Sequence, residues 1–435
     1  MNTAETATEN VFASRDYKRS RNAYVIQCAF EYFVSIFVSD AFLAKLLASL
    51  GLSDALIGII ASLVSFSFLF QLLSILMMQH ITNIKRTVIV CDTVSQLFFL
   101  GLYLLPFAPI PQSARGAAAT ALLLLAYFVK YLISSMYFRW ANAFVDPHGR
   151  AVFSARKEVI SLISGILFTL AAGAMMDRFE AAGNLRGSFL CIAVVMLVLN
   201  AANFVCLLLI RNASAAETAQ MRKPFGDALR HVIGNRSFLC VVLMTSLWDV
   251  ARYLTYGFLG TFKTRDLLIT VGTVQIINMI ANIGRIFLSG PFGRYSDRHS
   301  YAAGYRMAML MAALAFGVNV FTTQKTWWMI AVFTLLFNSS LAGSNQNGMN
   351  ILYHYVDPDY LIQAVAIKNS VAGLVGFGAS LVGGRILAAV QENGNVVLGI
   401  PMYGQQLLSA ISCLLALATA AYTYFRVEKL PHRST

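Results

Sequence analysis

Eight ionisable side chains lie inside segments that are otherwise apolar, and they are the residues of this chain best suited to chemistry. Four are acids and four are bases: Glu31, Asp40, Asp92, Lys130, Asp249, Arg252, Arg285 and Arg385. A charge at the centre of a lipid bilayer costs about 2.5–3.5 kcal/mol on insertion scales, so each needs a partner or a function. A buried acid can carry a proton and a buried base can bind an anion. The equal numbers of acids and bases favour pairing inside the protein.

Two interpretations stay open for the first of these acids. Glu31 is either a proton carrier or one half of a structural ion pair with Lys130 or Arg285. The two bases, in turn, either bind an anionic group of a substrate or act as the counter-charge to Glu31. We favour the counter-charge, because it needs no ligand.

The predicted roles of the other charged residues are simpler. Asp249 and Arg252 are three residues apart and can reach each other on one helix, which favours a structural or gating pair. We expect the charged ends of Asp40 and Arg385 to extend towards the membrane surface.

Polar side chains gather in five of the apolar segments, and in the first four they recur every three or four residues, a spacing that places them on one face of a helix. The stripes are Gln27, Glu31, Ser35 and Ser39; Tyr127, Lys130, Tyr131 and Ser134; Thr245, Asp249, Arg252 and Tyr256; Gln275, Asn278, Asn282 and Arg285; and Asn338, Asn345, Gln346, Asn347 and Asn350. Together they predict a water-filled cavity with hydrogen-bonding walls. The predicted cavity residues for substrate and protons are Gln27, Glu31, Lys130, Asp249, Arg252, Gln275, Asn278, Asn282, Arg285, Asn345 and Gln346. The amides of the last stripe could instead hold helices together.

The composition places these stripes in a membrane. The chain has 435 residues, of which 58% are hydrophobic and 12% charged, and its mean hydropathy is +0.65. Soluble proteins carry about 25% charged residues, and one spanning helix needs about 20 apolar residues. Lipid offers no partner to an unpaired backbone group, so each span must be helical. Twelve spans are predicted: 23–45, 55–78, 88–107, 117–140, 158–176, 188–210, 237–262, 267–292, 304–321, 327–346, 370–390 and 400–424.

The net charge of +13 has a topological explanation. Most lysines and arginines fall on the side of the membrane that holds the N-terminus, which is the positive-inside pattern. This predicts a multi-pass protein of the plasma membrane with both termini in the cytoplasm, and it disfavours nucleic-acid binding.

The two halves of the chain repeat each other. Val145-Asp146-Pro147 recurs as Val356-Asp357-Pro358, and the same offset of 211 residues matches Lys157 with Lys368, Gly165 with Gly376 and Gly173 with Gly384. Internal repeats are typical of secondary transporters, in which the substrate site lies where the repeats meet. We therefore predict an N-terminal tail (1–22), two six-helix bundles (23–210 and 237–424), a cytoplasmic linker with a short amphipathic helix (211–236) and a C-terminal tail (425–435).

With two repeated six-helix halves and a cytoplasmic linker between them, the chain resembles the major facilitator superfamily. The segment Gly293-Arg294-Tyr295-Ser296-Asp297-Arg298 is similar to the family's G-x-x-x-D-R loop between spans eight and nine, whereas its first-half counterpart, Gln79–Arg86, lacks the glycine and the aspartate. The resemblance implies an all-α fold of 12 transmembrane helices in two pseudo-symmetric bundles that alternate access to a central site. It also implies a cytoplasmic gate at Gly293, Asp297 and Arg298, with Asp297 capping span five near Glu158.

These patterns predict a secondary transporter that couples proton movement through Glu31 to the uptake of a small polar solute. An exporter of amphipathic compounds is the first alternative, because aromatic residues such as Tyr127, Tyr131 and Trp248 lie near the predicted cavity. A transporter-like sensor that binds solute without moving it is the second. No nucleotide-binding or nucleophile motif occurs, and the histidines fall in predicted loops or the tail, so we expect no enzyme, no cofactor and no metal. The expected partners are a small-molecule substrate, protons and the lipid bilayer, with the protein as a monomer.

Overall fold

The computed structural model describes residues 14–78, 80–81, 83–145, 150–212, 230–357 and 360–430. Over these ranges the chain is almost entirely helical, and its only sheet is a hairpin of β1 (Val396–Val397) and β2 (Ile400–Pro401). Helices therefore carry the polar stripes seen in the sequence.

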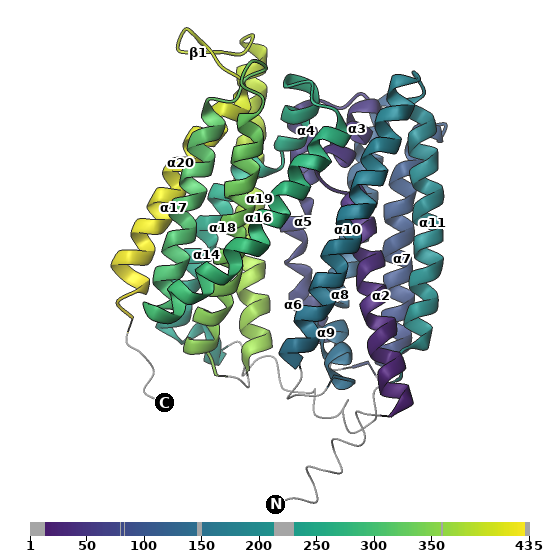
Figure 1. Cartoon of the computed structure of the whole chain (residues 1–435), viewed down its shortest axis with the longest axis vertical. Coiled ribbons are helices and arrows are strands. Elements are labelled where there is room, and N and C mark those ends of the chain that lie inside the picture. Colours follow the sequence, from purple (N-terminus) through teal and green to yellow (C-terminus); the bar gives the residue numbers. More distant parts are fainter. Residues whose placement is uncertain are drawn as a thin grey trace, which may run out of the picture. The chain divides into compact units, whose positions relative to one another are not determined.

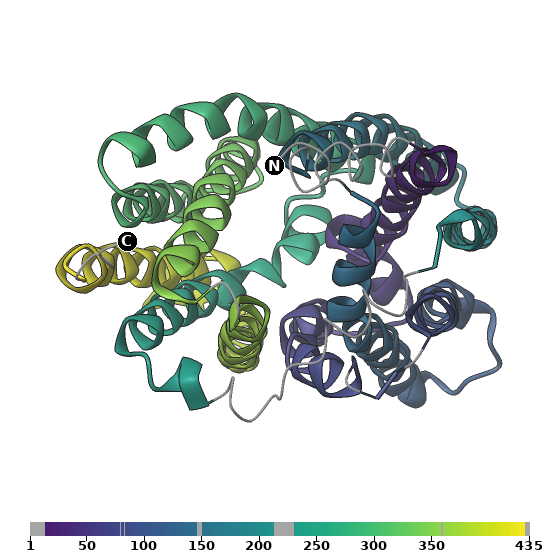
Figure 2. The same cartoon turned by 90° about the horizontal axis from the view of Figure 1, so that it is seen from below.

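Contacts along the chain divide it into two compact units, and the first comprises Met1–Ser39 and Phe70–Pro224. Its helices are α2 (Arg15–Phe37), α6 (Phe70–Met78), α7 (Ile84–Leu104), η1 (Leu105–Phe107), α8 (Gln112–Leu132), α9 (Ser134–Ala143), α10 (Arg150–Ala181) and α11 (Leu185–Leu209). Helix α11 packs against both α2 and α7. In Figure 1, α7 and α11 stand side by side, and they are seen nearly end on in Figure 2.

The second unit comprises Asp40–Leu69 and Phe225–Thr435. From the first half of the chain it takes α3 (Asp40–Ser49), α4 (Asp54–Ala61) and α5 (Leu63–Ser67). From the second half it takes α14 (Arg236–Tyr256), α15 (Leu259–Thr261), η2 (Phe262–Asp266), α16 (Val271–Arg298), α17 (Tyr301–Val320), α18 (Met329–Tyr355), α19 (Leu361–Glu392), α20 (Gly404–Tyr422) and η4 (Thr423–Val427). Helix α17 packs on α18 and α20, and α14 packs on α19.

Most of the helices are long and apolar enough to span a membrane. Ten segments of the described chain have the required length and hydropathy, and the bent pair of α2 and α3 adds an eleventh. Helix α18 lies where the tenth span is predicted and is 27 residues long, but amide and hydroxyl side chains interrupt its apolar sequence. The predicted all-α membrane fold is confirmed.

Span one is broken, whereas we predict one continuous helix over 23–45. Helix α2 ends at Phe37, and Asp40 opens α3 with a backbone φ of 44°, a left-handed conformation that interrupts helical hydrogen bonding. The hydroxyl of Tyr103 donates a hydrogen bond of 2.6 Å to the carbonyl oxygen of Phe37. This bond satisfies one of the carbonyls that the end of a helix leaves without a partner.

The predicted end of span eight at residue 292, and with it the start of the following loop, is also wrong. Helix α16 continues through Pro291 to Arg298, so the predicted gate residues Gly293, Asp297 and Arg298 lie on its last turns. The predicted tail likewise contains helix, since α2 begins at Arg15.

Some predictions fall outside the described residues. These are most of the linker 211–236 with its amphipathic helix, and parts of the repeated Val-Asp-Pro motifs at 146–147 and 358. The division into bundles 23–210 and 237–424 stays a prediction, and the packing adds that Asp40–Leu69 lies in the second compact unit.

Close backbone approach holds Asp40–Leu69 within the second unit. A Cβ atom on Gly257 would lie 2.4 Å from the carbonyl oxygen of Gly58, and one on Gly373 would lie 2.3 Å from the carbonyl oxygen of Ser65. The Ser65 hydroxyl also donates a 2.7 Å hydrogen bond to the carbonyl oxygen of Gly373. Small residues are favoured at helix contacts in membranes for this reason.

We predict that Gly257→Ala destabilises the protein by about 1–3 kcal/mol, because the added methyl group would overlap the Gly58 carbonyl and force two helices apart. Thermal unfolding of the purified protein in detergent measures the effect. Gly378→Ala on α19 is the matched control, since a Cβ there would have no neighbour within 4 Å. Equal unfolding temperatures for the two variants would contradict the close contact.

Candidate functional site

In the first unit, the structure brings Glu31 of α2 and Lys130 of α8 together. The Nζ atom of Lys130 lies 3.9 Å from Oε1 of Glu31, and the two side chains are 30% and 20% exposed, respectively. This separation is at the outer limit of an ion pair, so the attraction is weak enough for the two groups to separate.

Asp92 of α7 joins this cluster from a buried position. Its carboxyl group interacts electrostatically with Glu31, and the Nδ2 atom of Asn203 on α11 donates a 2.6 Å hydrogen bond to its Oδ2 atom. Asp92 is only 2% exposed.

Neutral polar groups extend the cluster along α2. The hydroxyl of Tyr137 donates a hydrogen bond to Oε1 of Gln27, and the sulfur atom of Cys28 lies 3.9 Å from the same hydroxyl. Ser35 continues the predicted stripe, but its hydroxyl donates to the carbonyl oxygen of Tyr32 in its own helix. Gln27 and Glu31 of α2 therefore both have polar partners on other helices.

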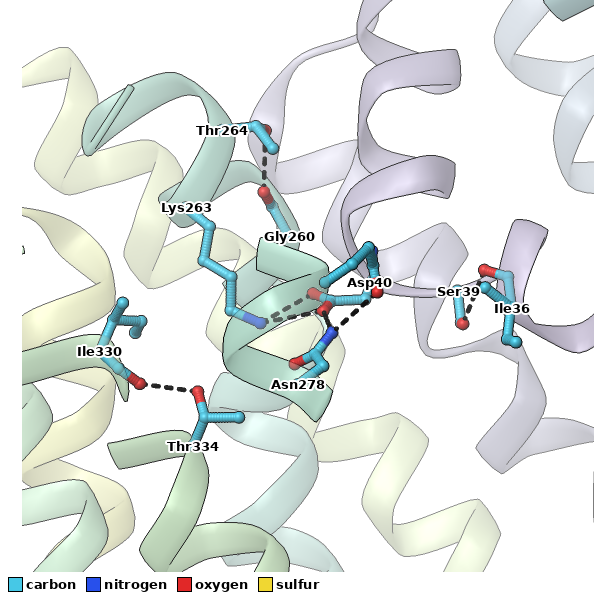
Figure 3. A network of polar contacts seen from close by, with 10 residues as sticks. Ile36, Ser39, Asp40, Gly260, Lys263, Thr264, Asn278, Ile330 and Thr334 are labelled. Carbon is cyan, nitrogen blue, oxygen red and sulfur yellow. Dashed lines mark hydrogen bonds and ion pairs between the residues drawn. The ribbon is translucent and has the colours of Figure 1, made fainter. Parts of the chain in front are cut away.

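In the second unit, a polar network is centred on Asp40 (Figure 3). The Nζ atom of Lys263 lies 3.0 and 2.9 Å from the two carboxylate oxygens of Asp40. The Nδ2 atom of Asn278 donates to Oδ2 of Asp40 at 3.0 Å and to Oε1 of Gln275 at 3.3 Å. The Lys263 side chain is 6% exposed. Asp40 therefore neutralises a buried cation, a role that our expectation of a surface-directed side chain does not include.

A second ion pair lies at the same end of this unit. Nη1 of Arg265 lies 2.5 Å from Oδ1 of Asp54, whose Oδ2 accepts a 2.9 Å hydrogen bond from Gln391 of α19. Arg265 and Lys263 both belong to η2, a single turn of π-helix. Such turns are rare and often occur at functional positions.

The predicted pair of Asp249 and Arg252 is part of a wider arrangement. The guanidinium of Arg252 lies over the rings of Tyr253 and Tyr256, 5.0 and 5.1 Å from their centroids. Asp249 interacts electrostatically with both Arg252 and Lys368 of α19. The acid thus has two cations nearby instead of one.

The remaining predicted site residues lie on α16 and α18. Asn282 and Arg285 are half-buried on α16, and Asn345 and Gln346 are exposed on α18. The side chain of Gln346 lies beside Gly293, 3.3 Å from the place of a Cβ atom there. Asp297 and Arg298 are exposed at the end of α16. The capping role of Asp297 stays a prediction, and the side chain of Glu158 lies outside the described residues.

Sequence reasoning missed three contacts. Lys263 is 223 residues from Asp40 and directly follows a predicted span, so nothing in its spacing marks it as a partner. Asn203 sits in a strongly apolar helix, where its amide and that of Asn200 are the available signal of a buried acceptor nearby. The internal repeat does single out Lys368, because this residue corresponds to Lys157 in the first half.

The comparisons with known proteins fit this geometry. The family model described as MFS/sugar transport protein matches residues 93–421. The chain belongs to this family. As a member of the MFS/sugar transport protein family, it is a multi-pass membrane transporter of the major facilitator type, which confirms the resemblance seen in the sequence. No curated protein sequence matches the chain.

Solved structures similar to this MFS protein have the same 12-helix fold. A mutant of the nucleoside transporter NupG has a TM-score of 0.72 and 13% identity, covering 93% of this chain and 99% of that chain. A bacterial homologue of the human lysosomal transporter Spinster, inward-facing and unoccupied, has a TM-score of 0.71 and 14% identity, with coverages of 95% and 97%. A D-xylose–proton symporter has a TM-score of 0.64 and 12% identity, with coverages of 91% and 95%.

We predict that Lys263→Met costs about 3–5 kcal/mol of stability, because it leaves the Asp40 carboxylate without its counter-charge. The double variant Asp40→Asn, Lys263→Met should recover a large part of this loss. Thermal unfolding of the two single variants and the double variant gives the coupling energy. Lys325→Met, at an exposed lysine of the same unit, is the control. Additive effects of the two single changes would argue against the pair.

Proposed function

We propose that this protein is a secondary transporter that takes up a small polar solute together with protons by alternating access. Both termini lie in the cytoplasm, the membrane is the plasma membrane, and the protein works as a monomer. The positive-inside pattern of the sequence supports this orientation.

The environment of Glu31 is the observation that carries proton coupling. It is an acid in an apolar helix, partly exposed, with Lys130 at 3.9 Å. When Glu31 is ionised, Lys130 can neutralise it. When Glu31 is protonated, Lys130 loses its counter-charge and can interact with another group, such as a solute oxygen. One proton therefore changes the charge balance between α2 and α8, as coupling requires.

Alternating access also needs contacts that open and re-form. The segment Asp40–Leu69 is continuous in the chain with α2 and α6, and its acids Asp40 and Asp54 pair with Lys263 and Arg265. We infer that these pairs hold the segment Asp40–Leu69 in place within the second unit, and that they separate when this segment moves during transport. A pair with several polar partners can break without leaving every charge unsatisfied.

The solute class follows from the polar side chains. Amides at Gln275, Asn278 and Gln346 suit hydroxyl or carbonyl groups better than a strongly charged ligand. The family description includes sugar transport, and the neighbours named above include transporters of a nucleoside and of D-xylose. A sugar or a similar polyhydroxylated compound fits this set.

The purified protein in liposomes that contain the pH-sensitive dye pyranine tests the proposal. Pentoses, hexoses and nucleosides are added outside one at a time, and a transported solute should acidify the interior. Glu31→Gln should reduce acidification to the rate of protein-free liposomes, because an amide cannot carry a proton.

Glu392→Gln is the control, since this acid is exposed at the end of α19. It should acidify as the wild type does. Solute uptake that is indifferent to a pH gradient, and unchanged in Glu31→Gln, would remove proton coupling from the proposal.

A further inference from the structure

Two helices of the first unit, α7 and α11, pack side by side in opposite directions. Near the start of α7, the Nζ atom of Lys85 donates to the carbonyl oxygens of Leu208 and Ile210 at the end of α11, at 2.8 and 2.6 Å. Near the end of α7, the ring of Tyr103 lies beside that of Phe189 at the start of α11, with centroids 6.2 Å apart. These contacts fix which turns of the two helices lie opposite each other.

A buried polar cluster follows this register. Asp92 of α7 accepts a 2.6 Å hydrogen bond from Nδ2 of Asn203 on α11. Gln96 lies one turn further along α7, and because the helices are antiparallel, Asn200 lies one turn further in the same direction on α11. The α7–α11 polar cluster consists of Asp92, Gln96, Asn200 and Asn203. Each of the four residues is at most 6% exposed.

The amide oxygens of this cluster all lack a hydrogen-bond donor. Oε1 of Gln96, Oδ1 of Asn203 and both polar atoms of Asn200 have no hydrogen-bond partner among the residues that the structure describes. Buried polar atoms are nearly always paired in native proteins, so a group of such oxygens indicates a bound species. Three amide oxygens beside a carboxyl group suit a species that accepts electron pairs, which is a cation.

Helix packing alone does not require these polar side chains. Helices α17 and α20 also pack together, and by their order in the two halves of the chain they correspond to α7 and α11. Residues 301–318 of α17 and 407–422 of α20 contain no acid and no side-chain amide. Small and apolar side chains are therefore sufficient for this kind of helix contact.

Charge selects the class of cation. In their ionised forms, Asp92, Glu31 and Lys130 carry a net charge of −1, and Lys130 interacts electrostatically with both acids. One monovalent cation cancels this charge, whereas a divalent cation would leave a positive charge inside the membrane. Carboxylate and amide oxygens are hard ligands, which suit alkali and alkaline-earth cations better than transition metals.

We propose that the α7–α11 polar cluster binds one alkali-metal cation, sodium or potassium. The carboxylate of Asp92 supplies the negative charge, and the amide oxygens replace part of the hydration shell of the ion. The bound cation joins α7 to α11 and stabilises the first unit. This site departs from our expectation of no metal, which rested on the positions of the histidines. It does not depend on the proton coupling proposed above.

Thermal unfolding of the purified protein in detergent tests the site without any solute. The wild type is compared in sodium, potassium and N-methyl-D-glucamine chloride at equal ionic strength. Sodium or potassium should raise the unfolding temperature by about 2 °C or more over N-methyl-D-glucamine, and the gain should saturate with concentration. The salt that gives the larger gain identifies the cation.

Asn200→Leu and Gln96→Leu distinguish a cation site from a purely structural cluster. In N-methyl-D-glucamine, each variant should unfold at the wild-type temperature or above it, because it removes a buried oxygen that has no donor. Each should also lose the gain from sodium or potassium. Asn319→Leu is the matched control, since Asn319 is a fully buried amide of α17 whose Oδ1 also lacks a partner in the described chain. This variant should keep the full gain.

Asp92→Asn removes the charge but leaves an oxygen that can accept the bond from Asn203, so this variant should fold and lose the gain. Equal unfolding temperatures of the wild type in the three salts would overturn the site. A full gain in both Asn200→Leu and Gln96→Leu would overturn it as well. Neither result depends on solute uptake or on Glu31→Gln, so failure of the cation site and failure of proton coupling are distinguishable.

Discussion

The constraint on which this structure depends is that a charge inside the membrane must meet a partner from the protein. Hydrocarbon supplies neither counter-ions nor hydrogen bonds, so each buried acid and base selects its neighbours. In the first unit, Glu31 meets Lys130 and Asp92. In the second, Asp40 meets Lys263 and Asn278. These two clusters connect helices that are far apart in the sequence, and they place the ionisable groups where a transporter of this family can use them.

The two clusters have different geometries, and the difference suits different tasks. The Asp40–Lys263 pair is short, nearly dry on the lysine side and supported by an amide, so separating it costs free energy. The Glu31–Lys130 pair is long and partly exposed. A loose pair responds to a single proton at little cost, whereas a tight pair holds a conformation. Coupling therefore fits the first unit, and holding the segment Asp40–Leu69 in place fits the second.

Much of the fold could be predicted from the sequence, because lipid allows few solutions. Apolar length predicts helices, and the spacing of Gln27 and Glu31 places both on one face of α2. The break at Asp40 could not be predicted, since nothing in the local sequence marks its left-handed backbone; in the structure the helix that it opens, α3, packs against η2 and α16. The partner of Asp40 could not be predicted either. A helical pattern indicates which residues share a face, but not which distant lysine contacts that face. Asp92 and Asn203 lie on different helices and could be matched only by their contact.

The account depends most on protons that move with solute through Glu31. Electrophysiology on a solid-supported membrane measures this directly, because an uncharged sugar or nucleoside carries no current by itself. For a solute that the protein transports, a concentration jump should produce an inward transient current in the wild type and none in Glu31→Gln. Uptake of the same solute by the wild type without any current would contradict the account.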